Sequence, residues 1–190
     1  MSLSNVCAVN FNSFVFTDLK AFVNYALYLS IRVKMSTKLE KQYKEAVANW
    51  TRSNNFTLWG TCLFNFNSLR DDADKKKAIR RFFNALDRHI YTTKEIAKEG
   101  KRVERLVFVE QGRSRTFLHW HFYCKAENAK QLKKIINFTQ KFWHEKTEDT
   151  QKLELNTNSY GDERSGYAIK EFRETDNEQI FVECCYLKHE

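Results

Sequence analysis

The segment TFLHWHFYC, residues 116–124, constrains the fold more than any other part of the chain. Successive side chains of a β-strand point to opposite faces, so His119 and His121 share one face. The apolar residues that alternate with them, such as Trp120 and Phe122, share the other face. The segment RLVFVEQ at 105–111 has the same β-forming composition, and a short connection containing a glycine joins the two as a predicted hairpin. A hairpin with one apolar face predicts an antiparallel sheet whose helices pack on that face.

The rest of the chain predicts strands and helices in the order β, α, β, β, α, β, α, β, preceded by one helix. This order indicates an α+β fold in which helices cover a mostly antiparallel central sheet. Residues 1–54 are predicted to form an N-terminal helical extension and residues 55–190 the main domain. The remaining strands are expected at 56–66, 153–157 and 180–187, and the helices at 36–54, 75–98, 126–146 and 167–174.

The charge of the chain indicates an anionic partner. The formal net charge is +8, and residues 148–190 hold 5 Lys/Arg against 11 Asp/Glu, which leaves +14 on residues 1–147. A polyanion is therefore expected on surfaces built from the first three quarters of the chain. The five cysteines include no CxxC pair, and the apolar stretch at 19–31 is shorter than a membrane span, so we expect a soluble intracellular protein with reduced thiols.

The two histidines of the hairpin predict a metal site. If Gln111 pairs with Thr116 across a four-residue loop, Glu110 lies diagonal to His119 on the same face. Two imidazoles and one carboxylate leave coordination positions open, which a catalytic divalent ion requires. An HxH pair is by itself also compatible with an ordinary half-exposed pair on a strand.

A tyrosine and a lysine near the C-terminus predict nucleophilic chemistry. Tyr167 and Lys170 lie three residues apart, on one face of the helix expected at 167–174. A tyrosine oxygen can attack phosphorus, and a nearby lysine can neutralise phosphate charge or help to deprotonate the phenol. Such a pair on a surface helix can equally pack and be solvated. Tyr160 lies seven residues earlier among loop-forming residues and is not assigned a role.

Taken together and in this order, these motifs resemble those of the HUH endonuclease superfamily, in its single-tyrosine rolling-circle replication initiators. Phe56-Thr57-Leu58 matches the first motif, His119-Trp120-His121 the HUH motif, and Tyr167-Ala168-Ile169-Lys170 the YxxK motif. The resemblance covers roughly residues 55–187. The first motif departs from many viral members, because it continues as Trp59-Gly60 and not as a polar pair.

The resemblance implies a ferredoxin-like or RRM-like sheet and an enzyme that nicks and rejoins single-stranded DNA through a 5′-phosphotyrosine intermediate. Its site residues would be Tyr167 and Lys170 for catalysis and His119, His121 and Glu110 for Mn²⁺ or Mg²⁺. Arg113 and Arg115, in the hairpin loop, are the candidate DNA contacts. The implied partner is a replication origin, in the cytoplasm of a prokaryotic host or the nucleus of a eukaryotic one.

Three other interpretations remain open. A transposase or a mobilisation relaxase would use the same site, although a relaxase usually carries its tyrosine before its histidines. A non-catalytic nucleic-acid-binding module on a ferredoxin-like sheet would use the basic surface and the aromatic residues without a metal. The sequence has no GxxxxGK[ST] phosphate-binding loop, so unwinding is expected to need a host or viral helicase, acting with a polymerase.

Overall fold

The structure is a computed structural model that describes residues 37–64, 72–111, 118–146, 153–157 and 180–188. Its sheet has four strands in the order β2-β3-β1-β4, and each neighbouring pair is antiparallel. The chain order β1-α3-α4-β2-β3-α5-β4 with this strand order is the interleaved pair of split β-α-β units found in ferredoxin-like domains. The predicted α+β fold with a mostly antiparallel sheet is therefore confirmed. The bounds are α2 Thr37–Ser53, β1 Leu58–Leu63, α3 Asp72–Ile90, α4 Thr93–Glu99, β2 Glu104–Gln111, β3 Leu118–Lys125, α5 Ala129–Lys146 and β4 Leu153–Asn156.

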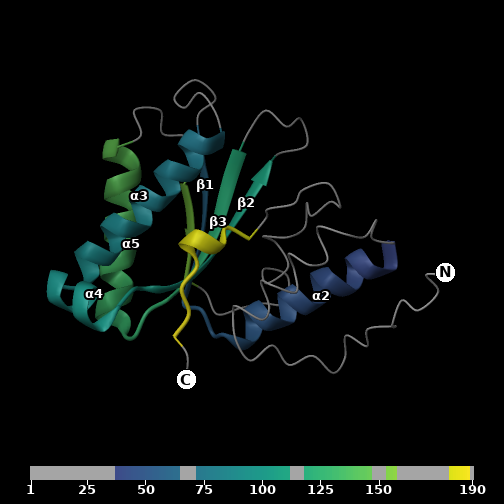
Figure 1. The fold of residues 1–190 in the computed structure, drawn as a ribbon, viewed down its shortest axis with the longest axis horizontal. Helices are drawn as coiled ribbons and strands as arrows, with labels where there is room; N and C mark the ends of the chain where they lie inside the picture. The colour runs from purple at the N-terminus through teal and green to yellow at the C-terminus, as the bar shows by residue number, and fades with distance from the viewer. Residues whose placement is uncertain (1–36, 65–71, 112–117, 147–152, 158–179, 189–190) are drawn as a thin grey trace, which may run out of the picture.

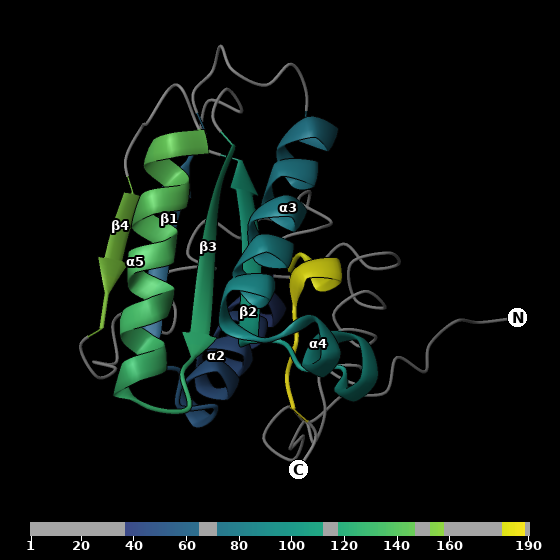
Figure 2. The ribbon, with the colours of Figure 1, turned by 90° about the vertical axis from the view of Figure 1, so that its left-hand side faces the viewer.

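The helices lie in layers on the two sides of the sheet. Helices α3 and α5 lie side by side over one face, and α2 lies on the opposite side (Figures 1 and 2). The face under α3 and α5 is apolar, as the alternation of residues 116–124 predicts. Trp120 and Phe122 of β3 are fully buried there, with ring centroids 5.3 Å and 6.1 Å from that of Phe82 on α3. Because this face of β3 packs on α3 and α5, its other face, which carries His119 and His121, points away from these two helices.

The helix predicted at 75–98 is two helices. Helix α3 ends at Ile90, and α4 begins at Thr93 after a capping box. Thr92 adopts an extended conformation, its hydroxyl accepts a hydrogen bond from the backbone N–H of Glu95, and the Glu95 carboxylate accepts from the backbone N–H of Thr92. Because the cap residue leaves the helical conformation, the chain turns at this point. The helix predicted from residue 126 begins later than expected, at Ala129, where the Asn128 side chain accepts a hydrogen bond from the N–H of Gln131.

The strand predicted at 180–187 is not a regular strand. Only Ile180 and Tyr186 form bridges to β2, and a 3₁₀ helix, η3 (Val182–Cys184), lies between them. Phe181 and Cys184 are buried while Val182 is exposed, so burial repeats every three residues and not every two. This segment covers the outer edge of β2, with hydrogen bonds in both directions between the backbones of Arg105 and Tyr186. The helix predicted at 167–174 lies outside the described residues.

A buried ion pair links α3, β2 and the C-terminal segment. Arg105 Nη1 lies 2.7 Å from Asp87 Oδ1, and Arg105 Nε donates to the carbonyl oxygen of Cys184 at 2.8 Å. Asp87 Oδ1 also accepts from the backbone N–H of Val103 at 2.9 Å, and the guanidinium lies 4.8 Å from the ring centroid of Phe83. Both charges are nearly inaccessible to solvent, so their mutual compensation is a condition for this packing.

Among the helices that the structure describes, none is both long enough and apolar enough to span a membrane.

Gly60 sits at the centre of β1 on the face toward the helices, directly opposite Phe122. A Cβ atom there would overlap the Phe122 ring and approach Leu155 Cδ2 to 3.0 Å. The absence of a side chain at this position lets the Phe122 ring lie against the strand.

We therefore expect Gly60→Ala to lower the free energy of unfolding by about 1–3 kcal/mol, because the core must shift to accommodate the methyl group. Urea denaturation measures this, with Asn84→Ala on the exposed surface of α3 as the control. Unchanged stability of the Gly60 variant would contradict the packing described.

Candidate metal centre

Strand pairing brings three potential metal ligands to one place. Glu110 of β2 is directly opposite His119 of β3, and His121 follows two residues later on the same face. The loop prediction was wrong by two residues: Gln111 pairs with Leu118 and not with Thr116, so the connection spans 112–117. Because side chains alternate with a period of two, this shift leaves Glu110 on the histidine face and moves it from a diagonal to a direct neighbour of His119.

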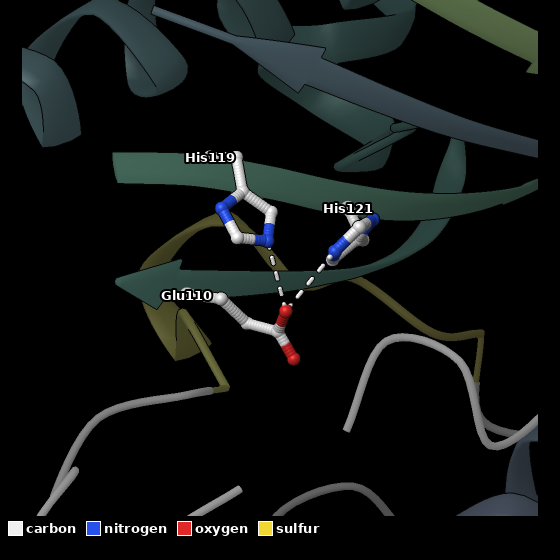
Figure 3. A group of neighbouring side chains, drawn as sticks. All are labelled: Glu110, His119 and His121. Carbon is white, nitrogen blue, oxygen red and sulfur yellow. Dashed lines mark hydrogen bonds and ion pairs between the residues drawn. The ribbon is translucent and has the colours of Figure 1, made fainter. Parts of the chain in front are cut away.

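One carboxylate oxygen is shared by both histidines (Figure 3). The Oε2 atom of Glu110 lies 3.0 Å from His119 Nε2 and 3.3 Å from His121 Nε2. The two imidazole rings are nearly perpendicular, with centroids 5.0 Å apart, and both present Nε2 to the carboxylate. One potential ligand atom from each of the three residues lies within 4.8 Å of the others. This group can therefore hold a metal ion.

The site is buried except at one histidine. The side chains of Glu110 and His121 are 0% and 2% exposed, whereas that of His119 is 18% exposed. A ligand would therefore reach the group from the side of His119. Burial raises the pKa of Glu110, but the hydrogen bonds from His119 and His121 and their charges outweigh it, so this pKa is lowered from its ordinary value. Glu110 is thus held as a carboxylate, the form that binds cations.

The second oxygen of Glu110 adds to the case for a cation. Oε1 is buried and has no hydrogen-bond partner among the described residues. A buried, ionised oxygen without a partner is costly, and a carboxylate at a metal centre can use both oxygens. For metal–ligand bonds of about 2.1 Å, neighbouring ligands are about 3.0 Å apart in octahedral and about 3.4 Å apart in tetrahedral geometry. The two Nε2···Oε2 separations lie in that range, so the donor set fits a divalent ion.

Two residues of β1 support the group from behind. Thr61 is directly opposite His121, and its Oγ1 lies 2.8 Å from His121 Nδ1. When Nε2 presents its lone pair to a cation, Nδ1 carries the proton and donates it to this hydroxyl. The hydroxyl can also donate to Nδ1 when Nε2 is protonated and hydrogen-bonded to Glu110. The Trp59 ring is stacked on His121, with a centroid separation of 6.1 Å and an interplanar angle of 11°.

Sequence reasoning missed Thr61 and Trp59. The only signal for them is the alternation of residues 57–63, which places both on the same face of a strand. The sequence around these residues does not indicate that this strand pairs with β3. The residues matched to the first motif, 56–58, lead into this strand, which begins at Leu58. Phe56 and Leu58 are buried, and Thr57 Oγ1 accepts from the backbone N–H of Ala126 at 2.8 Å. They hold the start of β1 against the end of β3.

The other predicted site residues lie outside the described residues. Arg113 and Arg115 fall in the connection at 112–117, and Tyr167 and Lys170 fall in 158–179. The structure therefore brings together Glu110, His119 and His121. The roles of the other four residues stay predictions.

Comparison with known proteins returned no matching family model, no matching curated protein and no matching solved structure.

Replacement of any one ligand should weaken metal binding. We expect His119→Ala, His121→Ala and Glu110→Gln to reduce Mn²⁺ affinity by more than about 100-fold, which exceeds the usual cost of losing a group that only orients a ligand. Isothermal titration calorimetry measures this on the folded variants. His89→Ala is the matched control, because His89 is an exposed histidine of α3 on the other side of the sheet. If Glu110→Gln binds Mn²⁺ as the unaltered chain does, the carboxylate is not a ligand.

Thr61 should act through His121. Thr61→Val keeps the shape of the side chain but removes the hydroxyl that orients the imidazole, so we expect a loss of Mn²⁺ affinity of about 10- to 100-fold. Thr61→Ser retains the hydroxyl and should restore most of the affinity. Equal affinities for the valine and serine variants would show that the 2.8 Å contact does not position the ligand.

Proposed function

We propose that this protein is a metal-dependent endonuclease that nicks and rejoins single-stranded DNA through Tyr167, as rolling-circle replication initiators of the HUH superfamily do. The observation that carries the proposal is that His119 and His121 both contact one buried carboxylate oxygen of Glu110. The further support is in the sequence, where a YxxK segment follows the histidine pair in the order that these initiators use.

The chemistry divides between the metal centre and the C-terminal motif. A divalent ion at this site would withdraw electron density from a non-bridging oxygen of the scissile phosphate. The Tyr167 phenol loses its proton and its oxygen forms a bond to phosphorus, while the bond from phosphorus to the 3′ oxygen breaks and that oxygen takes up a proton. Lys170 neutralises charge on the phosphate or the phenolate. One phosphodiester replaces another, so the reverse reaction rejoins the ends without ATP.

The donor set bears on the choice of metal. Carboxylate oxygen suits Mg²⁺ and Mn²⁺, whereas imidazole nitrogen favours the transition metal of the two. We propose Mn²⁺ or Mg²⁺ as the working ion, with Mn²⁺ bound more tightly. The exposed side of His119 is the direction from which the phosphate would approach.

The runner-up within the enzyme class is a transposase, which would use the same metal site and the same order of motifs. The alternative from another class is an RRM-like binding module, which stacks bases on aromatic side chains exposed on the sheet. The aromatic residues on this face weigh against it. Trp59, Phe108 and Tyr123 are 8%, 1% and 0% exposed, so their rings are covered and not displayed to a nucleic acid.

Tyr167→Phe removes one oxygen and keeps the ring, so it should abolish the covalent adduct and leave single-strand binding unchanged. The assay incubates the protein with labelled oligonucleotides and Mn²⁺, separates the products under denaturing conditions and maps the modified peptide. Tyr160→Phe is the matched control and should form the adduct at the normal rate. Chelation of the metal should also prevent the adduct.

Two outcomes would contradict the proposal. DNA attached to Tyr160, or to any residue other than Tyr167, would refute the assignment of the nucleophile. Binding of single strands without any adduct, in the presence of Mn²⁺, would favour the non-catalytic module.

A further inference from the structure

A strongly cationic surface lies on the side of the sheet away from the metal centre. Helices α3 and α5 meet along a seam where His89 lies against Phe138, with ring centroids 5.0 Å apart, and Phe82 lies against Phe138 and Phe142 at 5.9 Å and 5.4 Å. Exposed cationic residues flank this seam on both helices, and we call them the basic face. They are Lys77, Arg81 and Arg88 on α3 and Lys130, Lys134 and Lys141 on α5.

The spacing of these residues places them in two rows. On each helix the three cations are separated by four and then seven residues, which puts them on one stripe of the helix surface. Helix α3 presents the opposite side to the core, through Ile79, Phe82 and Leu86. The contacts across the seam join residue 89 to 138 and residue 82 to 142, so the helices run antiparallel and the two rows are staggered. Together they form a band roughly 25 Å long, at a rise of about 1.5 Å per residue.

The basic face has one sign of charge. Between residues 75 and 90 the only acidic residue is Asp87, which is buried in its pair with Arg105, and between residues 129 and 143 there is none. The acidic residues close to the band in sequence are Asp72 and Asp74 at the start of α3, Glu127 just before α5 and Glu145 in the last turn of α5. A merely solvated surface usually intersperses both signs, because like charges repel. A band of cations with few acidic neighbours indicates a polyanionic ligand.

Two other cations of α3, Lys76 and Arg80, contact the C-terminal segment and are therefore not part of the basic face. Arg80 is paired with Glu183, and its guanidinium lies 5.3 Å from the Phe181 ring centroid. Lys76 lies 5.9 Å from the same centroid. These two cations hold the C-terminal segment. Arg81, Arg88 and Lys134 form no ion pair within the part of the chain that the structure describes.

We propose that the basic face binds the phosphate backbone of duplex DNA. Proteins that hold single strands combine cations with exposed aromatic side chains for base stacking, and among the described residues the only large apolar side chain that is exposed is Val182, outside the basic face. The same fact disfavours a membrane, since a helix that binds a lipid surface inserts large apolar residues beside its cations. A duplex presents one charge per about 1.7 Å along its axis, so the band faces several phosphates of each strand.

The test measures the affinity of the full chain for a fluorescent blunt-ended duplex by anisotropy over a range of salt concentrations. The variant Arg81→Gln, Arg88→Gln, Lys134→Gln should bind the duplex more than about 10-fold more weakly at low salt. The slope of log affinity against log salt should become shallower by about two to three units, because each lost phosphate contact accounts for about 0.9. The control variant Lys41→Gln, Lys94→Gln, Lys98→Gln removes three exposed cations from α2 and α4 and should retain both affinity and slope.

Three results would overturn this inference: no duplex binding by the unaltered chain, an equal loss in the control variant, or binding to phosphatidylserine vesicles but not to DNA. The inference does not rest on the proposed nicking activity. Adduct formation with a single-stranded oligonucleotide should persist in the Arg81, Arg88, Lys134 variant. Conversely, a failure of all adduct formation would leave the duplex measurement intact, so the two proposals can fail separately.

Discussion

The register between β2 and β3 is the constraint on which the metal centre depends. On the face toward the helices, this register sets Val107 opposite Phe122 and Val109 opposite Trp120, and all four are buried under α3 and α5. A slip of β3 by one residue would turn Trp120 and Phe122 outward and bury the histidines in the apolar core, which is far more costly. The apolar packing on one face therefore holds the polar group together on the other.

The sequence predicted the faces of the hairpin correctly and its register incorrectly, for a physical reason. Alternation is a local property, so His119 and His121 could be assigned to one face from residues 116–124 alone, whereas Glu110 was placed on that face only by the assumed pairing of Gln111 with Thr116. Register depends on where the loop ends, and residues 112–117 contain no turn signal strong enough to choose between four and six residues. The break between α3 and α4 was encoded by Thr92 and Glu95, a capping box that lies inside a helical pattern and is easily read as part of it.

Thr61 could not have been found in the same way, because its role comes from a contact between strands that are 60 residues apart. Its sequence neighbours identify a strand, but the order β2-β3-β1-β4 decides that this strand lies beside β3. The C-terminal segment illustrates the same limit. Phe181 and Cys184 are spaced for a 3₁₀ turn, yet residues 180–187 have strand-forming composition, and their conformation is fixed by packing against β2 and by the Arg105 side chain.

The two buried carboxylates among the described residues, Asp87 and Glu110, show why the metal centre differs from a structural ion pair. Asp87 has its Oδ1 between Arg105 Nη1 and the Val103 N–H. Its Oδ2 also has no hydrogen-bond partner among the described residues, but it lies 3.4 Å from Arg102 Nε, so permanent cations compensate the charge at both oxygens. Glu110 is equally buried, but its neighbours are imidazoles, which carry charge only when protonated, and its Oε1 has no hydrogen-bond partner in the described part of the chain. Packing alone would favour replacing such a group with apolar residues. A carboxylate that is ionised, buried and incompletely paired is a group that can hold a cation, and His119 is the one of the three side chains that is partly open to solvent.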